Sequence, residues 1–216
     1  MLSFDHLHAL PPDWDLLVGA DTGTYMGMVF CAICPDPYAL LMVAEVPNYR
    51  YVSNEIELLG LSVPEWARLC HVIFRHLRPR ETKLKAWADP NTQFRAELSH
   101  YDIHLLANER GPELRTEIAR EYLHAVDPQR LYFAPWLQIL PYEIEHAKWP
   151  DAVTGAGKFT RLKGDDHLLD PFEHVCSRRP RRKALTEQKK PSFLDQQLAL
   201  HRRPIVQAGD PHLGHL

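Results

Sequence analysis

Two aspartates directly follow short apolar runs in this chain. Asp21 follows residues 16–20 and Asp89 follows residues 84–88. Both runs have the length and composition of buried strands. We therefore expect each carboxylate at the C-terminal end of a strand, where a polar side chain is exposed at the sheet edge. A third acid, Asp170, is expected on a helix near the end of the folded region.

Three carboxylates from separate elements can meet at one point and bind Mg²⁺ or Mn²⁺, because hard cations prefer oxygen ligands. Two such ions, about 4 Å apart, stabilise the attacking and leaving oxygens of a phosphodiester displacement. Asp21, Asp89 and Asp170 are therefore candidate catalytic residues of a two-metal site. The chain has 28 acidic residues, and most acids are solvated. For any single aspartate a surface role is the simpler interpretation, and the joint placement favours the metal site.

Two residues just before Asp170 are accessory candidates. His167 lies three positions earlier and is a candidate metal ligand or proton carrier. An exposed position in the first helical turn is an equally good interpretation of His167. Asp166 is a second candidate ligand, although its position favours a role as the side-chain cap of the helix.

The hydrophobic pattern predicts a mixed α/β fold. Apolar runs at 16–21, 26–33 and 39–46, joined by short turns, predict an antiparallel meander of three strands. The further predicted elements are helix 64–77, strand 84–88, helix 91–99, strand 103–106, helix 112–126, strand 131–133, helix 136–146 and helix 166–175. Residues 47–63 and 150–164 are expected to be loops. A meander followed by alternating strands and helices predicts a mixed central sheet with helices on both faces.

One helix has a well-defined apolar stripe. Pro64 suits a first helical turn, and Pro79 follows the predicted end. The stripe has helical spacing and comprises Trp66, Leu69, Cys70, Ile73, Phe74 and Leu77. We expect this stripe to pack on the sheet.

Charge divides the chain into a domain, 1–176, and a basic, partly disordered tail, 177–216. The tail has nine Lys or Arg and three Asp or Glu, a balance of +6, so residues 1–176 carry −9 of the overall −3. An acidic domain suits a protein that collects carboxylates for metal and contacts phosphates locally. The candidate contacts with a nucleic-acid backbone are Arg178, Arg179, Arg181, Arg182 and Lys183. A solvated hinge explains the same five cations equally well.

Several classes of protein are excluded by what the sequence lacks. No apolar run approaches the roughly 20 residues of a membrane span. The first residues lack the basic and apolar segments of a signal peptide. Four cysteines suit a reducing compartment, so we expect a cytosolic protein without a membrane partner.

Four stretches, in this order, resemble one known family. They are 17–24 with Asp21, the Asp89-Pro90 pair within 86–90, the stretch 131–149, and the His-x-x-Asp pattern within 166–170. The chain resembles the C-terminal nuclease domain of the large terminase subunit of tailed bacteriophages over about residues 15–176. It departs from the family in two ways. Pro171-Phe172 follows Asp170 where the family often has Ala and an aromatic residue, and the preceding motor ATPase domain is absent.

The resemblance implies a ribonuclease H-like fold and a divalent-metal-dependent endonuclease that cuts double-stranded DNA during phage genome packaging. It implies that Asp21 bridges two Mg²⁺ or Mn²⁺ ions, with Asp89 and Asp170 completing the sites. The implied partners are double-stranded DNA, a terminase ATPase domain, the small terminase subunit and the portal. We expect a monomeric isolated domain in the host cytoplasm. Two alternatives stay open: another ribonuclease H-like nuclease, such as a junction resolvase or an RNA–DNA hybrid cutter, and a non-catalytic packaging-motor docking module.

Overall fold

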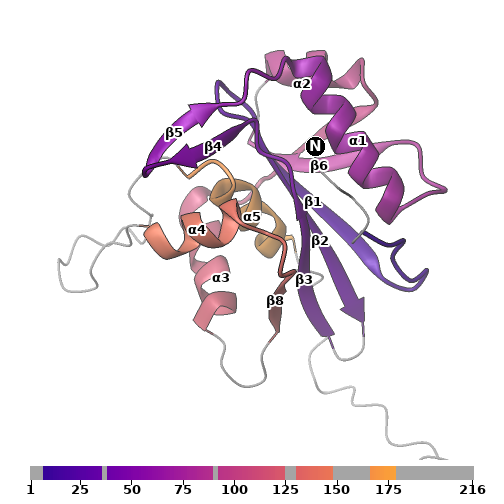
Figure 1. Cartoon of the computed structure of the whole chain (residues 1–216). Coiled ribbons are helices and arrows are strands. Elements are labelled where there is room, and N and C mark those ends of the chain that lie inside the picture. The colour runs from indigo at the N-terminus through magenta and orange to yellow at the C-terminus, as the bar shows by residue number, and fades with distance from the viewer. Residues whose placement is uncertain (1–6, 36–37, 90–91, 125–129, 148–165, 179–216) are drawn as a thin grey trace, which may run out of the picture. The chain divides into compact units, whose positions relative to one another are not determined.

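A six-stranded mixed sheet organises the protein (Figure 1). The computed structural model describes residues 7–35, 38–89, 92–124, 130–147 and 166–178. The strands run across the sheet in the order β7-β6-β1-β2-β3-β8. Their bounds are β1 (Asp15–Asp21), β2 (Gly27–Pro35), β3 (Tyr38–Glu45), β6 (Leu84–Ala88), β7 (Ile103–Ala107) and β8 (Leu131–Phe133).

The first three strands form the predicted antiparallel meander. Asp15 pairs with Ile33 and Asp21 with Gly27 between β1 and β2, and β3 pairs with the other edge of β2. The remaining strands join in parallel: β6 beside β1, β7 beside β6, and β8 beside β3. The prediction of a mixed α/β sheet is therefore confirmed.

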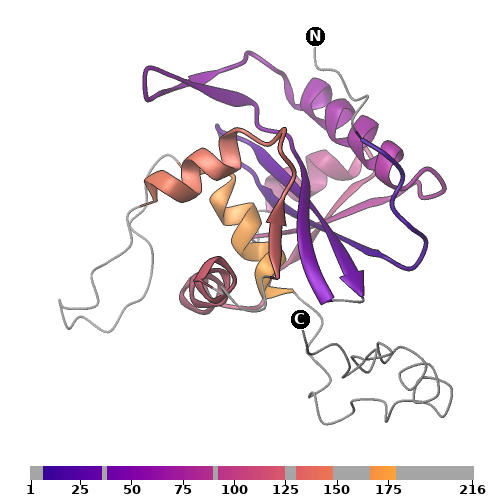
Figure 2. The same cartoon turned by 60° about the horizontal axis from the view of Figure 1, so that its bottom comes forward.

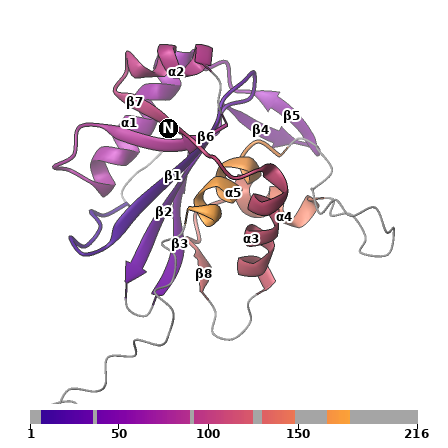
Figure 3. The ribbon, with the colours of Figure 1, turned by 180° about the vertical axis from the view of Figure 1, so that it is seen from behind.

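Helices cover both faces of this sheet, as the views from opposite sides show (Figures 1 and 3). On one face lie α1 (Val63–Leu77) and α2 (Thr92–Ser99). On the other lie α3 (Pro112–His124), α4 (Ile139–His146) and α5 (Leu169–Ser177). Each face has its own apolar core, because alternate side chains of a strand point to opposite faces. Val18 and Ala20 of β1 join the α1 core, whereas Val29 and Cys31 of β2 join the other.

Helix α1 begins and packs as its sequence predicts. Glu65 accepts a hydrogen bond from the Ser62 backbone amide (2.9 Å), which satisfies a group at the start of the helix. Trp66, Phe74 and Leu77 are buried in the core against the sheet. The apolar stripe of this helix therefore faces the sheet, as expected.

The expectation of a loop over residues 47–63 is wrong. A two-stranded hairpin occupies this segment, with β4 (Tyr49–Val52) antiparallel to β5 (Glu55–Leu58). Ser53 and Asn54 both have positive φ, 52° and 67°. That conformation matches the two-residue turn whose twist suits a hairpin. The turn has Ser-Asn instead of the more familiar Asn-Gly, so the sequence signal is weaker.

The described residues contain no helix long and apolar enough to cross a membrane. The predicted loop 150–164 and the tail from residue 179 onward lie outside the described residues.

Candidate functional site

Asp21 and Asp89 follow neighbouring parallel strands at matching positions. Gly19 in β1 pairs with Trp87 in β6, and each aspartate lies two residues further along its chain. Side chains two residues apart in a strand point to the same face. Asp21 and Asp89 therefore lie on one face of the sheet, at the C-terminal ends of β1 and β6.

Helix α5 covers that face close to the two aspartates. A Cβ atom added to Gly19 would lie 2.0 Å from the backbone oxygen of Pro171. A Cβ atom added to Gly27, which pairs with Asp21, would lie 2.5 Å from the backbone oxygen of His167. Glycine at both positions lets the start of α5 approach the sheet this closely. Figure 2 shows α5 lying between the sheet and helices α3 and α4.

Asp170 is the second residue of α5, directly before Pro171. It is therefore carried onto the same face of the sheet as Asp21 and Asp89. Pro171 is the third residue of the helix, within the first turn, where an amide has no partner in the helix. The expectation that this proline removes a hydrogen bond of α5 is wrong. The helix continues from the bond that the Phe172 amide donates to the Leu168 carbonyl (3.0 Å).

The interpretation of Asp166 as the side-chain cap of this helix is also wrong. The N-cap residue is Leu168, and no neighbouring side chain caps it. Asp166 contributes its backbone carbonyl, which accepts a hydrogen bond from the Leu169 amide (3.1 Å). The amides at the start of the helix are bound instead by Glu143 of α4.

His167 lies beside Asp21. Its Nδ1 is 3.2 Å from Asp21 Oδ2, and the Asp21 side chain keeps 29% of its surface exposed. The imidazole stacks on the ring of Tyr25, with ring centroids 4.8 Å apart. Tyr49 meets the same imidazole edge-on at 5.7 Å. Two aromatic rings thus hold the imidazole in place against the carboxylate.

Arg115 of α3 binds Asp89 with both of its terminal amino groups. Nη1 contacts Oδ1 and Nη2 lies 3.3 Å from Oδ2. The Arg115 side chain is 5% exposed, whereas Asp89 is 60% exposed. Sequence reasoning missed Arg115, because the apolar spacing of the predicted helix points to Leu114. In the structure Leu114 is 47% exposed and Arg115 is buried in its place.

His174, one turn after Asp170, is a further buried neighbour of Asp89. Its Nε2 lies 3.6 Å from Asp89 Oδ1, and Asn108 Nδ2 donates a hydrogen bond to its Nδ1 (2.9 Å). Burial, reinforced by the Arg115 charge, lowers the pKa of His174 to about 4 although Asp89 and Asp170 oppose the shift. The imidazole is therefore neutral, with its proton on the nitrogen that faces Asp89. Both Asp89 and Asp170 act electrostatically on this imidazole.

The chemistry of these donors fits a hard divalent cation, because carboxylate oxygens from three elements are directed to one edge of the sheet. Within the described ranges, however, no group of three or more His, Cys, Asp or Glu side chains is close enough together to hold a metal ion. Arg115 accounts for part of this, because its guanidinium occupies both oxygens of Asp89. A metal ion at Asp89 would have to compete with that guanidinium.

Among the cations proposed to contact DNA, Arg178 is the one that the structure describes. Its guanidinium lies 3.8 Å above the Trp87 ring and donates a hydrogen bond to the Ala107 carbonyl (3.2 Å). Trp87 is two residues before Asp89, so this cation lies close to the candidate site. Arg179, Arg181, Arg182 and Lys183 lie outside the described residues.

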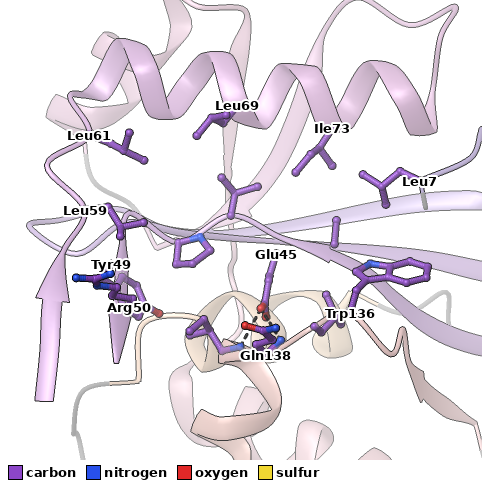
Figure 4. A pocket seen from close by; sticks show the side chains of 15 residues that line it. Leu7, Glu45, Tyr49, Arg50, Leu59, Leu61, Leu69, Ile73, Trp136 and Gln138 are labelled. Carbon is purple, nitrogen blue, oxygen red and sulfur yellow. Dashed lines mark hydrogen bonds between the residues drawn. The ribbon is translucent and has the colours of Figure 1, made fainter. Parts of the chain in front are cut away.

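A separate pocket of about 320 Å³ lies between α1, the segment after β3 and the start of α4 (Figure 4). Its walls are mainly apolar, with Leu61, Leu69 and Ile73 on one side and Trp136 on the other. None of the three candidate aspartates lines this pocket. The carboxylate site and the apolar pocket are therefore distinct features.

The fold is shared with solved large terminases. A full-length large terminase from a thermophilic bacteriophage, in complex with ADP, aligns with a TM-score of 0.56 and 15% identity over 80% of this chain and 42% of its own. The nuclease domain of the P22 large terminase aligns with a TM-score of 0.53 and 8% identity over 77% of this chain and 83% of its own. The large terminase nuclease from the thermophilic phage G20c, with bound magnesium, aligns with a TM-score of 0.48 and 12% identity over 79% of this chain and 85% of its own.

The chain thus spans less than half of the ADP-bound large terminase but most of the P22 domain. The ribonuclease H-like fold that the sequence resemblance implies is confirmed, and it is the fold of the P22 large terminase nuclease domain. No protein-family model and no curated protein matches the sequence.

Proposed function

We propose that the protein is a divalent-metal-dependent endonuclease that cuts double-stranded DNA. The observation that carries this proposal is the convergence of Asp21, Asp89 and Asp170 on the face of the sheet that α5 covers. The fold shared with the P22 large terminase nuclease domain supports it. The residues that would hold two Mg²⁺ or Mn²⁺ ions are these three aspartates, with His167 as an accessory group.

A pair of divalent cations supplies Lewis-acid stabilisation of the charge that develops on a phosphodiester during displacement. The chain's own groups set the geometry. His167, stacked on Tyr25, fixes the rotamer of Asp21. Arg115 fixes the carboxylate plane of Asp89. The cation Arg178, on Trp87, suits contact with the phosphate backbone, and we extend that role to the four cations that follow it.

The proposed setting is phage genome packaging in the host cytoplasm. Its support is that the ADP-bound protein and the P22 domain, which have the same fold, are a large terminase and a large terminase nuclease domain. In that setting the partners would be double-stranded DNA, a terminase ATPase domain, the small terminase subunit and the portal.

A second candidate is a packaging-motor docking module without catalytic activity. The observation that favours it is the Arg115 guanidinium bound to both oxygens of Asp89. If this pair does not open, Asp89 cannot complete a metal site. The two candidates differ in whether the protein binds Mn²⁺ at all, and a calorimetric titration decides between them.

Substrate preference separates the proposed function from its nuclease alternatives. Labelled linear duplex, four-way junction and RNA–DNA hybrid would be incubated with the protein in Mg²⁺ or Mn²⁺, and in chelator as the control. We expect duplex DNA to be cut in either metal and left intact in chelator. Faster cutting of the junction would identify a resolvase, and faster cutting of the hybrid would identify a ribonuclease. No cutting of any substrate, with no Mn²⁺ binding, would favour the docking module.

A further inference from the structure

A buried carboxylate lies at the start of α5. Glu143 of α4 is 2% exposed, and its Oε2 accepts hydrogen bonds from the backbone amides of Leu168 (2.8 Å) and Leu169 (3.0 Å). The start of a helix carries amides without partners in the helix and a partial positive charge. A carboxylate is therefore the favoured partner, and Glu143 supplies it from a different helix.

The two amides that Glu143 binds belong to the residues between His167 and Asp170. A shift of either amide moves at least one of these two candidate metal ligands. Hydrogen bonds from amides to an ionised carboxylate are about twice as strong as neutral ones. Glu143 therefore determines where the backbone at His167 and Asp170 lies relative to Asp21.

The second oxygen of Glu143 joins the same carboxylate to the β4–β5 hairpin. Tyr49 donates its hydroxyl proton to Oε1 (2.6 Å), and Tyr51 donates to the same oxygen (3.1 Å). Tyr49 also packs its ring edge-on against His167. Glu143 and Tyr49 thus hold His167 from two directions, through its neighbouring backbone and through its ring.

Glu143 is itself held in place by the capping of α4. Glu45, at the end of β3, accepts hydrogen bonds from the backbone amides of Gln138, Ile139 and Leu140, each at 2.8 Å. Figure 4 shows Glu45 directed at the start of this helix. The simple interpretation of Glu45 as a solvated strand end is therefore wrong. The sheet fixes α4 through Glu45, and α4 fixes α5 through Glu143.

We propose that Glu143 is a positioning residue of the metal site, which holds His167 and Asp170 in place through the two amides between them. This inference rests on the proposed function, because it takes these two residues as groups of a metal site. Four hydrogen bonds to one buried carboxylate support it, since they satisfy both oxygens with donors from two separate elements. Burial raises the pKa of Glu143 and these four hydrogen bonds oppose the rise.

The test replaces Glu143 by Gln in the full-length chain and measures the Mn²⁺ concentration that gives half-maximal plasmid cleavage. Glu143→Gln keeps the size of the side chain but replaces one accepting oxygen by a donor. Outer-shell groups of metal sites typically contribute 10- to 100-fold to metal affinity, so we expect the half-maximal concentration to rise by roughly that factor. Glu145→Gln, an exposed glutamate on the same helix, is the matched control and should leave it unchanged.

A merely structural role would lower the thermal stability of Glu143→Gln without changing the half-maximal Mn²⁺ concentration of the folded protein, and that result would overturn the proposal. If Glu143→Gln does not fold, Glu143→Asp replaces it. This variant keeps the charge but is one methylene shorter, and a half-maximal concentration equal to that of Glu145→Gln would again overturn the proposal.

A metal-free readout separates this inference from the proposed function. The amide proton resonances of Leu168 and Leu169, measured in chelator, should move upfield in Glu143→Gln and stay in place in Glu145→Gln. Unmoved amide resonances would contradict the positioning role. If the resonances move but the wild-type protein neither binds Mn²⁺ nor cuts DNA, the proposed function and the role in a metal site both fail, and only the structural contact remains.

Discussion

Arg115 gives the candidate site a positive charge within the protein itself. Carboxylates that converge without a cation repel one another, and this repulsion destabilises the folded protein. The Arg115 guanidinium is buried and binds Asp89, whose side chain still reaches solvent. In the metal-free protein this pair stabilises Asp89 and holds its plane. The structure therefore combines a site suited to cations with a residue that takes the place of one.

The buried imidazole of His174 makes the stability of the metal-free protein depend on pH. Its pKa is about 4 in the folded protein, against about 6.5 in an unfolded chain. Between these values the unfolded chain takes up a proton that the folded protein does not. Stability is therefore fully present above pH 6.5 and is lost as the pH falls toward 4. The loss should amount to about 3 kcal/mol, at roughly 1.4 kcal/mol per pKa unit.

Urea unfolding in chelator at pH 7.0, 5.5 and 4.5 measures this dependence. The groups that act on His174 are Arg115, Asp89, Asp170 and Arg178. His174→Gln should remove most of the loss over this range, because glutamine does not titrate. His100→Gln, at an exposed position, should behave as wild type. A His174→Gln variant with the full wild-type pH dependence would show that the loss arises elsewhere.

At the scale of elements, the position of α5 depends on a glycine in β1. An alanine Cβ at Gly19 would lie 2.0 Å from the backbone oxygen of Pro171, and a backbone atom cannot move aside alone. Overpacking of this kind typically costs about 1–3 kcal/mol and shifts the backbone. We expect Gly19→Ala to lower the free energy of unfolding by at least this amount, measured in a urea titration.

Gly23→Ala is the matched control for this prediction. Gly23 follows the same strand, and an added Cβ would have only an ordinary contact, 3.9 Å from the Tyr25 carbonyl oxygen. Its free energy of unfolding should stay within about 0.5 kcal/mol of the wild type, as for most substitutions away from tight packing. Equal stability of the two variants would show that α5 does not pack as tightly on β1 as described.

Most of the elements could be predicted from the sequence, because their signals are local. The apolar runs before Asp21 and Asp89 predict β1 and β6, and the stripe from Trp66 to Leu77 predicts α1. These patterns depend only on which face of an element is buried. The β4–β5 hairpin is the exception, since its turn lacks the usual glycine.

The support of the site was harder to predict, because it depends on contacts between distant residues. Arg115 and Asp89 are 26 positions apart, and Glu143 binds amides 25 and 26 positions further along the chain. No spacing rule connects such pairs. A buried arginine at an apolar position of α3 also contradicts the usual preference for charged residues at the surface.

At the scale of the whole molecule, charge separates the acidic domain from the basic segment that follows α5. We expect the four cations Arg179, Arg181, Arg182 and Lys183 to contribute most of the non-specific DNA affinity. Each phosphate contact changes the slope of log K against log salt by about 0.9. Replacing all four by alanine should therefore reduce that slope by roughly 3–4, measured by fluorescence anisotropy with labelled duplex.

The control for this measurement replaces two cations in another part of the protein, Lys83 and Lys85, which lie in and before β6 at the end of the strand opposite Asp89. This double variant should keep the wild-type slope. If the four-alanine variant also keeps it, the segment after α5 does not contact the DNA backbone.

Plasmid cleavage by aspartate variants tests the account most directly. Supercoiled plasmid would be incubated in Mg²⁺ or Mn²⁺ with the wild type, Asp21→Asn, Asp170→Asn and the control Asp15→Asn, at the opposite end of β1 from Asp21. An amide is a poor ligand for these hard cations, so Asp21→Asn and Asp170→Asn should remove nicking and linearisation while remaining folded. The wild type and Asp15→Asn should cut at equal rates and stop in chelator. Cutting that persists in chelator, or an Asp21→Asn variant that cuts at the wild-type rate, would contradict the metal-dependent nuclease.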